Sequence, residues 1–306
     1  MRDQLAPQDG FYTLVENDRN GQRMEIIGAV REVLCAPKCP PAVLTRLCHP
    51  ETKIVSLTVT EKGYCHDPAT GRLNHKHPQV KADLKTTNQP CSALGYLCEA
   101  LYRRWKQDLG PFSIVSCDNL PSNGKVLRGL LIEFAKLRDA ELADWIEDRV
   151  TCPSSMVDRI VPATTEKDRQ NVQKQLGLED QGVVVTEGFS QWVLEDNFCA
   201  GRPAWEEVGV TMVDDVTPFE HMKLRMLNGT HSTLAYLGFI AGHEFVADAA
   251  NDSDFQQLLL KMWQDEIIPT LSMPVGIDLQ AVSYTHLRAH ETREDRVCRL
   301  VREKKK

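Results

Sequence analysis

Two short apolar runs, each followed by a polar loop and a helical pattern, constrain the fold of this chain most strongly. Residues 54–59 and 112–117 are rich in β-branched and apolar side chains, as buried strands are. The periodic positions that follow predict helices from Ser92 to about residue 105 and over residues 126–137. Strand, polar loop and helix in alternation are typical of an α/β domain with a parallel sheet.

The rest of the chain divides into regions of different pattern. A further helix is expected over residues 165–180 and a third strand over residues 182–185, whereas residues 65–90 are rich in turn formers. From Phe219 onward only helical periodicity remains. We therefore expect three parts, with the bounds 1–218 for an α/β domain, 219–282 for the start of a helical domain and 283–306 for an adapter-like tail.

Bulk properties exclude several classes of protein. The net charge of −7 gives no reason to expect nucleic acid or an anionic membrane as a partner. No apolar run approaches the roughly 20 residues of a membrane helix, and the first residues carry no apolar signal segment. We expect a cytoplasmic protein. The spacing of Cys35 and Cys39 is not followed by a second ligand pair at finger-like spacing, so no metal site is predicted.

The polar loops that follow the two strands are candidate ligand sites by position. In open parallel sheets, ligands bind outside the carboxyl ends of the strands. Glu61 follows the first strand, and Asp118, Asn119 and Asn123 follow the second. Ordinary turn chemistry also explains these residue types, and from position alone it is the favoured explanation.

A polar stripe in the helical part is the second candidate site. At roughly 100° per residue, Glu220, Lys223 and His231 fall within an arc of about 80°, and Asn228 lies about 60° further round the helix. This face combines an acid/base group, an amide donor and an imidazole. A solvated helix face is the alternative, although such faces usually carry Glu/Lys pairs.

Five blocks in this order and spacing resemble the mannitol dehydrogenase family of long-chain polyol dehydrogenases. The blocks are SLTVTEKGY (56–64), SCDNLPSNG (116–124), MVDRIVP (156–162), QWVLEDNF (191–198) and FEHMKLRMLNGTHS (219–232). The resemblance covers about residues 10–282. Residues 201–205 and 270–274 are most similar to the fructuronate reductase, or mannonate oxidoreductase, branch.

The resemblance implies NAD-dependent hydride transfer at a secondary alcohol, without a metal. Lys223 would be the general base that takes the hydroxyl proton during oxidation and returns it during reduction. Asn119 and Asn228 would donate N–H groups to the developing alkoxide. Glu220 would relay protons between the lysine and solvent.

The same resemblance implies the binding residues. His231 and Asp158 would bind substrate hydroxyl groups, while Glu61, Val157 and Asn119 would lie beside the NAD cofactor. The substrate would be a sugar acid or a polyol.

Relatives of this kind begin with a strand and a Gly-x-Gly loop that holds the cofactor pyrophosphate, and this chain has no such loop. We therefore expect an incomplete Rossmann-type domain. Three alternatives remain open: a mannonate/fructuronate oxidoreductase, a mannitol or other hexitol dehydrogenase, and an inactive fragment. The sequence indicates neither the oligomeric state nor a choice between NAD and NADP.

Overall fold

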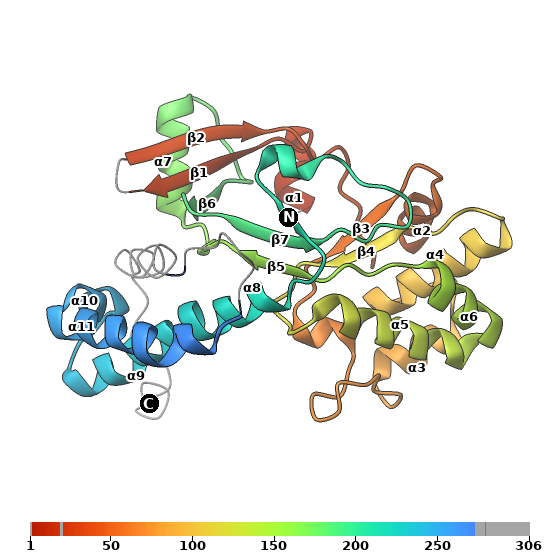
Figure 1. Cartoon of the computed structure of the whole chain (residues 1–306). Helices are drawn as coiled ribbons and strands as arrows, with labels where there is room; N and C mark the ends of the chain where they lie inside the picture. Colours follow the sequence, from red (N-terminus) through yellow and green to blue (C-terminus); the bar gives the residue numbers. More distant parts are fainter. Residues whose placement is uncertain (1, 19–20, 273–278, 280–306) are drawn as a thin grey trace. The chain divides into compact units, whose positions relative to one another are not determined.

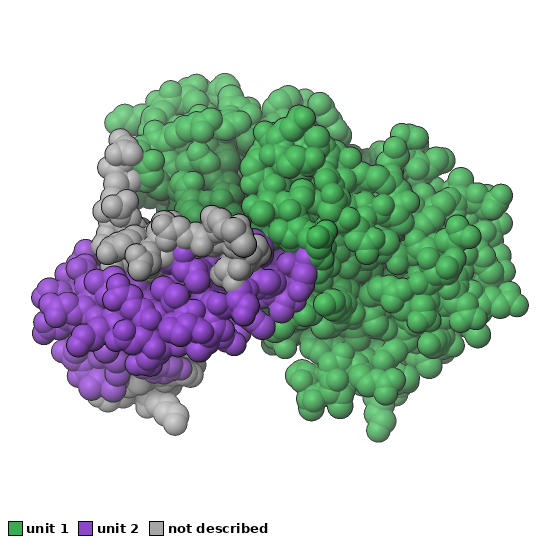
Figure 2. Space-filling view, viewed as in Figure 1, with its two compact units in different colours: residues 1–214 green, residues 215–306 purple. Residues whose placement is uncertain are grey.

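The structure, a computed structural model, describes residues 2–18, 21–272 and 279. The chain forms two compact units, residues 1–214 and residues 215–306, which Figure 2 colours separately. Each unit is described below by itself. The predicted boundary between residues 218 and 219 stays a prediction, and the tail at 283–306 lies outside the described residues.

Unit 1 contains strands and helices in alternation (Figure 1). Its strands are β1 (Tyr12–Asp18), β2 (Gly21–Ile27), β3 (Ile54–Leu57), β4 (Ser113–Ser116), β5 (Ser155–Asp158), β6 (Val184–Glu187), β7 (Gln191–Glu195) and β8 (Thr211–Val213). Its helices are α1 (Arg2–Leu5), α2 (Pro40–Cys48), α3 (Pro78–Lys85), α4 (Ala93–Lys106), α5 (Asn123–Arg138), α6 (Ala140–Arg149) and α7 (Glu166–Leu176).

The strands pair in three groups. β3 and β4 are parallel, with Leu57 opposite Ser116. β1 lies between β2, to which it is antiparallel, and β6, to which it is parallel. β7 lies between β5 (antiparallel) and β8 (parallel). The predicted parallel, Rossmann-type arrangement is confirmed, and the structure adds two antiparallel pairings to it.

The main core of unit 1 lies around β4 and helices α4 and α5. All four residues of β4 are buried, and α4 packs against α2, α5 and α6. The fully buried side chains include Leu97, Ile114, Leu127 and Leu131. Each contributes about 1.5–3 kcal/mol by leaving water, so this core fixes the position of the carboxyl ends of β3 and β4.

The predicted helices and strands of unit 1 agree with the structure in type, but some of them begin or end at other residues. Ser92 caps α4 as expected, because its hydroxyl oxygen accepts the N–H of Gly95 at 3.0 Å. The helix expected over residues 165–180 ends at Leu176, because Gly177 adopts a left-handed conformation with φ of 70°. Residues 65–90, which are rich in turn formers, also contain a helix over residues 78–85. There α3 begins with a proline at its first position, and the His77 ring nitrogen accepts the Gln79 N–H.

All the elements assigned in the described part of unit 2 are helical. Its elements are α8 (Thr217–Met222), the π-helical turn η4 (Lys223–Asn228), α9 (Gly229–Ala241), α10 (Val246–Asn251), α11 (Ser253–Lys261), the π-helical turn η5 (Met262–Ile267) and the short 3₁₀ turn η6 (Ile268–Thr270). Trp263 and Leu234 are among its fully buried side chains. The predicted helical second domain is confirmed.

The described residues contain no candidate membrane span and no candidate metal site. None of the helices there is long and apolar enough to cross a bilayer. No group of three or more histidine, cysteine or acidic side chains is placed to hold a metal ion among them.

Candidate active site

The carboxyl ends of β3 and β4 bring the first two sequence motifs together. Because the strands are parallel and Leu57 pairs with Ser116, the loops that follow them begin side by side. The Cys117 N–H donates to the Leu57 carbonyl at 2.8 Å and extends this pairing into the second loop. This is the sheet edge at which open parallel sheets bind ligands.

Asp118 connects the two loops directly. Its carboxylate accepts the backbone N–H groups of Val59 and Thr60, at 3.0 and 2.9 Å, and the phenol O–H of Tyr64 at 2.7 Å. Burial, together with this bond to Asp118, raises the pKa of the Tyr64 phenol. Tyr64 therefore stays a neutral hydrogen-bond donor in the working range of pH.

Asn123 connects the second loop to β5. Its side-chain N–H groups donate to the carbonyls of Ser116, Asp118 and Ser155 within 3.0 Å, and its carbonyl accepts the Ser155 N–H at 2.9 Å. The residue is fully buried and all its bonds go to the backbone. Asn123 therefore has a structural role in the turn, which is the explanation that its position in the sequence favoured.

Glu61 and Asn119 are among the residues of these loops that face solvent. Both residues are exposed, and the Glu61 side chain is 63% accessible. One Glu61 oxygen lies 3.8 Å from Nε2 of His66, whose ring is 91% buried. The loops thus present an amide and a carboxylate at the sheet edge while Asp118 and Asn123 hold the backbone behind them.

Val157 and Asp158 end β5, next to the edge formed by β3 and β4. Ser155, at the start of the strand, donates its hydroxyl to the Ser116 carbonyl at 2.6 Å and so attaches β5 to β4. Asp158 is 8% exposed and Val157 is half-buried. Unit 1 therefore brings Glu61, Asn119, Val157 and Asp158 to connected strand ends.

The residue after Asp158 anchors this strand end to the neighbouring sheet. Arg159 forms an ion pair of 2.5 Å with Glu16 on β1. The Ile160 N–H donates to the Glu187 carboxylate at 2.7 Å, and the Glu187 N–H returns to the Ile160 carbonyl at 3.2 Å. The end of β5 is held from both sides.

In unit 2 the predicted polar stripe runs through a π-helical turn. Lys223 and Asn228 are the first and last residues of η4, and the Gly229 N–H reaches the Leu224 carbonyl five residues earlier. Glu220 lies in α8 on one side, and His231 lies in the first turn of α9 on the other. All four residues are partly buried.

The π-turn corrects the angular positions that regular helical spacing predicts. A π-turn takes an extra residue per turn, with i→i+5 hydrogen bonds. Lys223 and Asn228, five residues apart, are therefore about one turn apart, and Asn228 lies closer in angle to the lysine than the 100° spacing places it. The extra residue thus gathers Glu220, Lys223, Asn228 and His231 on one face.

A second π-turn supports the first. Trp263 of η5 donates its indole N–H to the Thr230 hydroxyl at 2.9 Å, and both residues are fully buried. The Arg225 guanidinium donates to the carbonyl and hydroxyl oxygens of Thr270 at 2.8 and 2.7 Å. These bonds fix the helix on both sides of Asn228.

Comparison with known proteins agrees with this architecture. The family model for the mannitol dehydrogenase Rossmann domain matches residues 1–207, and the model for the mannitol dehydrogenase C-terminal domain matches residues 215–287. The chain belongs to the mannitol dehydrogenase family. The two matches follow the division into units.

Curated members of the family are similar over most of this chain. D-mannonate oxidoreductase of Escherichia coli is 46% identical over 279 residues, which are 90% of this chain and 57% of that protein. Mannitol 2-dehydrogenase of Aspergillus fumigatus is 43% identical over 284 residues, 91% of this chain and 57% of that protein. The chain thus spans less than two thirds of the length of these relatives.

A solved structure of the family has the same fold. Mannitol 2-dehydrogenase of Pseudomonas fluorescens, in a ternary complex with NAD and D-mannitol, superposes with a TM-score of 0.88 at 41% identity. The match covers 97% of this chain and 61% of that one.

The residues that hold the candidate site in place cannot be identified from the sequence alone. Arg159 lies within a recognised motif, but its partner Glu16 is 143 residues away in sequence. Thr230 lies within the last motif, but its partner Trp263 is 33 residues away in sequence and outside every motif. Only the spatial pairing shows what these side chains do.

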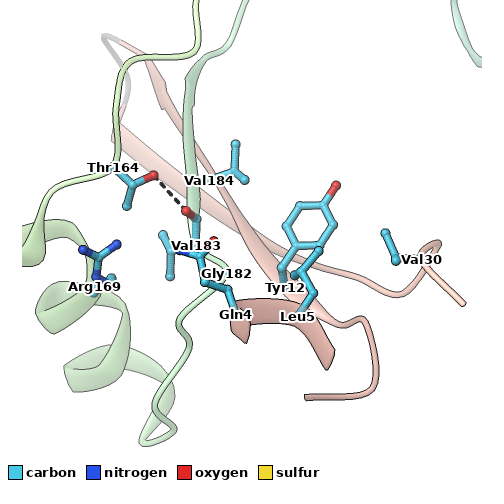
Figure 3. A pocket seen from close by; sticks show the side chains of 9 residues that line it. All are labelled: Gln4, Leu5, Tyr12, Val30, Thr164, Arg169, Gly182, Val183 and Val184. Carbon is cyan, nitrogen blue, oxygen red and sulfur yellow. Dashed lines mark hydrogen bonds between the residues drawn. The ribbon is translucent and has the colours of Figure 1, made fainter. Parts of the chain in front are cut away.

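A separate cavity of about 440 Å³ lies beside β1, β6 and α1 (Figure 3). Within it the Thr164 hydroxyl donates to the Val183 carbonyl at 2.8 Å. Its lining residues are Gln4, Leu5, Tyr12, Val30, Thr164, Arg169, Gly182, Val183 and Val184. None of them belongs to the predicted site.

Proposed function

We propose that this chain carries the proton-transfer and alkoxide-binding groups of an NAD-dependent oxidoreductase that interconverts D-mannonate and D-fructuronate. The observation that carries the proposal is the π-turn, which places a lysine, an amide and an imidazole on one helix face within a family of dehydrogenases. The 46% identity to D-mannonate oxidoreductase supports the sugar-acid substrate.

The chemistry assigned to unit 2 is proton transfer. Lys223 takes the hydroxyl proton of the secondary alcohol during oxidation and returns it when the ketone is reduced. Asn228, about one turn along, donates its amide N–H to the developing alkoxide. Glu220 exchanges the proton with solvent, and His231 binds a substrate hydroxyl.

Roles for residues of unit 1 are proposed from the same family motifs. Asn119 is the second amide donor to the alkoxide, and Asp158 binds a substrate hydroxyl. The two asparagines suit this task because they donate without titrating. They do not compete with the lysine for the proton.

The exposed groups at the sheet edge fit the nicotinamide end of NAD. Glu61, Asn119 and Val157 lie at connected strand ends, where dinucleotides bind in folds of this class. NAD bound there would supply the acceptor for the hydride of the alcohol carbon. No group for its pyrophosphate is assigned among these residues.

A hexitol 2-dehydrogenase is the second candidate. The 43% identity to mannitol 2-dehydrogenase and the fold shared with a complex of NAD and D-mannitol favour it. A uronate needs a cationic partner for its carboxylate. Arg202, in the segment that resembles the sugar-acid branch, is engaged by Asp196 at 2.6 Å and Glu206 at 2.6 Å, so we do not assign it that role.

The test measures NADH formation by the purified chain from NAD⁺ with D-mannonate or D-mannitol. We expect turnover with D-mannonate, and a loss of several orders of magnitude in kcat for Lys223→Ala, with NADH binding unchanged. Lys261→Ala, which removes an exposed lysine at the end of α11, is the matched control.

Each outcome decides between the alternatives. Turnover with D-mannitol alone favours the hexitol dehydrogenase. Turnover with neither substrate contradicts the proposal for this chain and favours an inactive fragment. A Lys223→Ala variant as active as the wild type removes the lysine from the mechanism.

A further inference from the structure

The two loops at the carboxyl ends of β3 and β4 share a closed ring of hydrogen bonds. The Asp118 N–H donates to Oγ of Ser116 at 3.3 Å, and Oγ of Ser116 lies 2.6 Å from the Tyr64 hydroxyl oxygen. The Tyr64 hydroxyl donates to the Asp118 carboxylate at 2.7 Å. An ionised carboxylate only accepts, so the tyrosine hydrogen points to Asp118 and the serine hydrogen points to Tyr64.

The three hydrogen bonds to the Asp118 carboxylate all come from donors. Oδ1 accepts the Thr60 N–H, and Oδ2 accepts the Val59 N–H and the Tyr64 O–H. An asparagine here would turn an NH₂ group toward at least one of these donors. The site therefore selects a carboxylate over its isosteric amide.

The backbone that Asp118 holds is strained. Thr60 has φ of 61° and ψ of 166°, a conformation that a β-branched residue rarely adopts. Ser122, on the other loop, has φ of 48°. Such conformations persist only where surrounding bonds enforce them, and the Asp118–Thr60 bond at 2.9 Å does so next to Glu61.

We propose that Asp118 is a positioning residue of the reaction, which holds Glu61 and Asn119 in their working geometry by tying the first loop to the second. This inference rests on the proposed function, because Glu61 and Asn119 have their roles only there. Asp118 is adjacent in sequence to Asn119, and its bond to Thr60 sets the backbone that leads into Glu61. It touches neither substrate nor cofactor in this assignment.

The chain offers a matched control for the test. Asp83 of α3 also accepts two backbone N–H groups, from Cys91 and Ser92 at 2.7 and 3.1 Å, and one hydroxyl, from Ser92 at 2.5 Å. These bonds hold the entrance to α4, and none of them joins the loop that follows β3 to the loop that follows β4. Asp83→Asn and Asp118→Asn therefore remove equivalent sets of bonds at different places.

The experiment compares these two variants and Tyr64→Phe with the wild-type chain. The readouts are kcat and KM with D-mannonate and NAD⁺, the urea midpoint, and hydrogen exchange of the amides of residues 59–61. For Asp118→Asn we expect kcat to fall by about 10- to 100-fold, as for a misplacement of about 1 Å, with faster exchange at residues 59–61. Tyr64→Phe keeps the two backbone bonds and should lose less. Asp83→Asn should lower the urea midpoint similarly and leave kcat unchanged.

The outcomes separate this inference from the proposed function. Equal kcat losses in Asp118→Asn and Asp83→Asn reduce Asp118 to a structural role and overturn the inference. Unchanged exchange at residues 59–61 in Asp118→Asn overturns it as well, whatever the activity. An inactive wild-type chain contradicts the proposed function, and with it the positioning role.

Discussion

The first turn of α5 offers the sharpest test of how this fold is packed. Gly124 follows Asn123, and a Cβ atom at Gly124 would lie 2.3 Å from the Cys152 carbonyl oxygen and 2.6 Å from the Ser154 nitrogen. Both atoms belong to the backbone that leads into β5. Ordinary van der Waals contact begins near 3.4 Å, so Gly124→Ala requires the helix and this segment to separate by about 1.1 Å.

The cost of that movement follows from the contacts it breaks. Overpacking of this kind costs about 1–3 kcal/mol. The Asn123 bonds to Ser155 stretch at the same time, and each contributes about 0.5–1.5 kcal/mol. Alanine regains up to about 1 kcal/mol through its helix propensity. We expect Gly124→Ala to lower the free energy of unfolding of unit 1 by about 2 kcal/mol or more.

Gly129 of the same helix is the matched control. A Cβ atom there meets nothing within 4 Å, so Gly129→Ala should raise the free energy of unfolding by up to about 1 kcal/mol. Urea titrations followed by circular dichroism measure both variants, with transitions of the two units fitted separately. A Gly124→Ala variant at least as stable as the wild type would refute the reasoning, because it would show that β5 is not held close to α5.

Two further predictions concern unit 2 and alkaline pH. Trp263→Phe leaves the buried Thr230 hydroxyl without its indole donor and should lower the free energy of unfolding by about 1–3 kcal/mol. A double-mutant cycle with Thr230→Val that shows no coupling energy would contradict this. Burial raises the pKa of the Cys98 and Cys152 thiols to about 12 in the folded chain. Because thiols of the unfolded chain ionise from about pH 8.5, the unfolded state binds fewer protons above that pH. The free energy of unfolding should then fall by up to about 1.4 kcal/mol per thiol and pH unit between about pH 9 and 12. Urea midpoints at pH 8 and 10 check this. The decrease of the midpoint with pH should be smaller in Cys98→Ala than in the control Cys39→Ala, which changes an exposed thiol. An equal decrease in the two variants would count against the prediction.

The strands and helices that the sequence predicts well are those with a continuous apolar pattern. β3 and β4 have apolar, β-branched runs that leave few alternatives, and α4 has both a cap at Ser92 and a regular apolar face. The pairing of β1 with β2 was not predicted, because Glu16, Asn17 and Asp18 at the end of β1 read as a polar stretch. Their partners lie on a neighbouring strand, which a linear pattern does not reveal.

Some residues of the candidate site could be proposed from the sequence, and others could not. Glu61 and Asn119 could be proposed from their positions after strands, and Lys223 and Asn228 from their motif. Asp118 and Asn123 share residue types with ordinary turns, so their hydrogen-bond partners alone distinguish what they do. The π-turn could not be predicted, because an apolar periodicity tolerates one extra residue without losing its face.

That extra residue has a consequence for how the helix can vary. Deleting one residue from η4 would restore regular α-helical hydrogen bonding and so relax the segment from Lys223 to Asn228. The residues after the deletion would keep nearly the same angle about the helix axis relative to α8, because four α-helical residues turn through about 400° and the five π-helical residues also make about one turn. His231 would therefore stay on the face of Lys223, while the spacing between the lysine and the asparagine would shorten from five residues to four. In sequences related to this one, a helix with one residue fewer between the lysine and the asparagine can thus keep the same polar face.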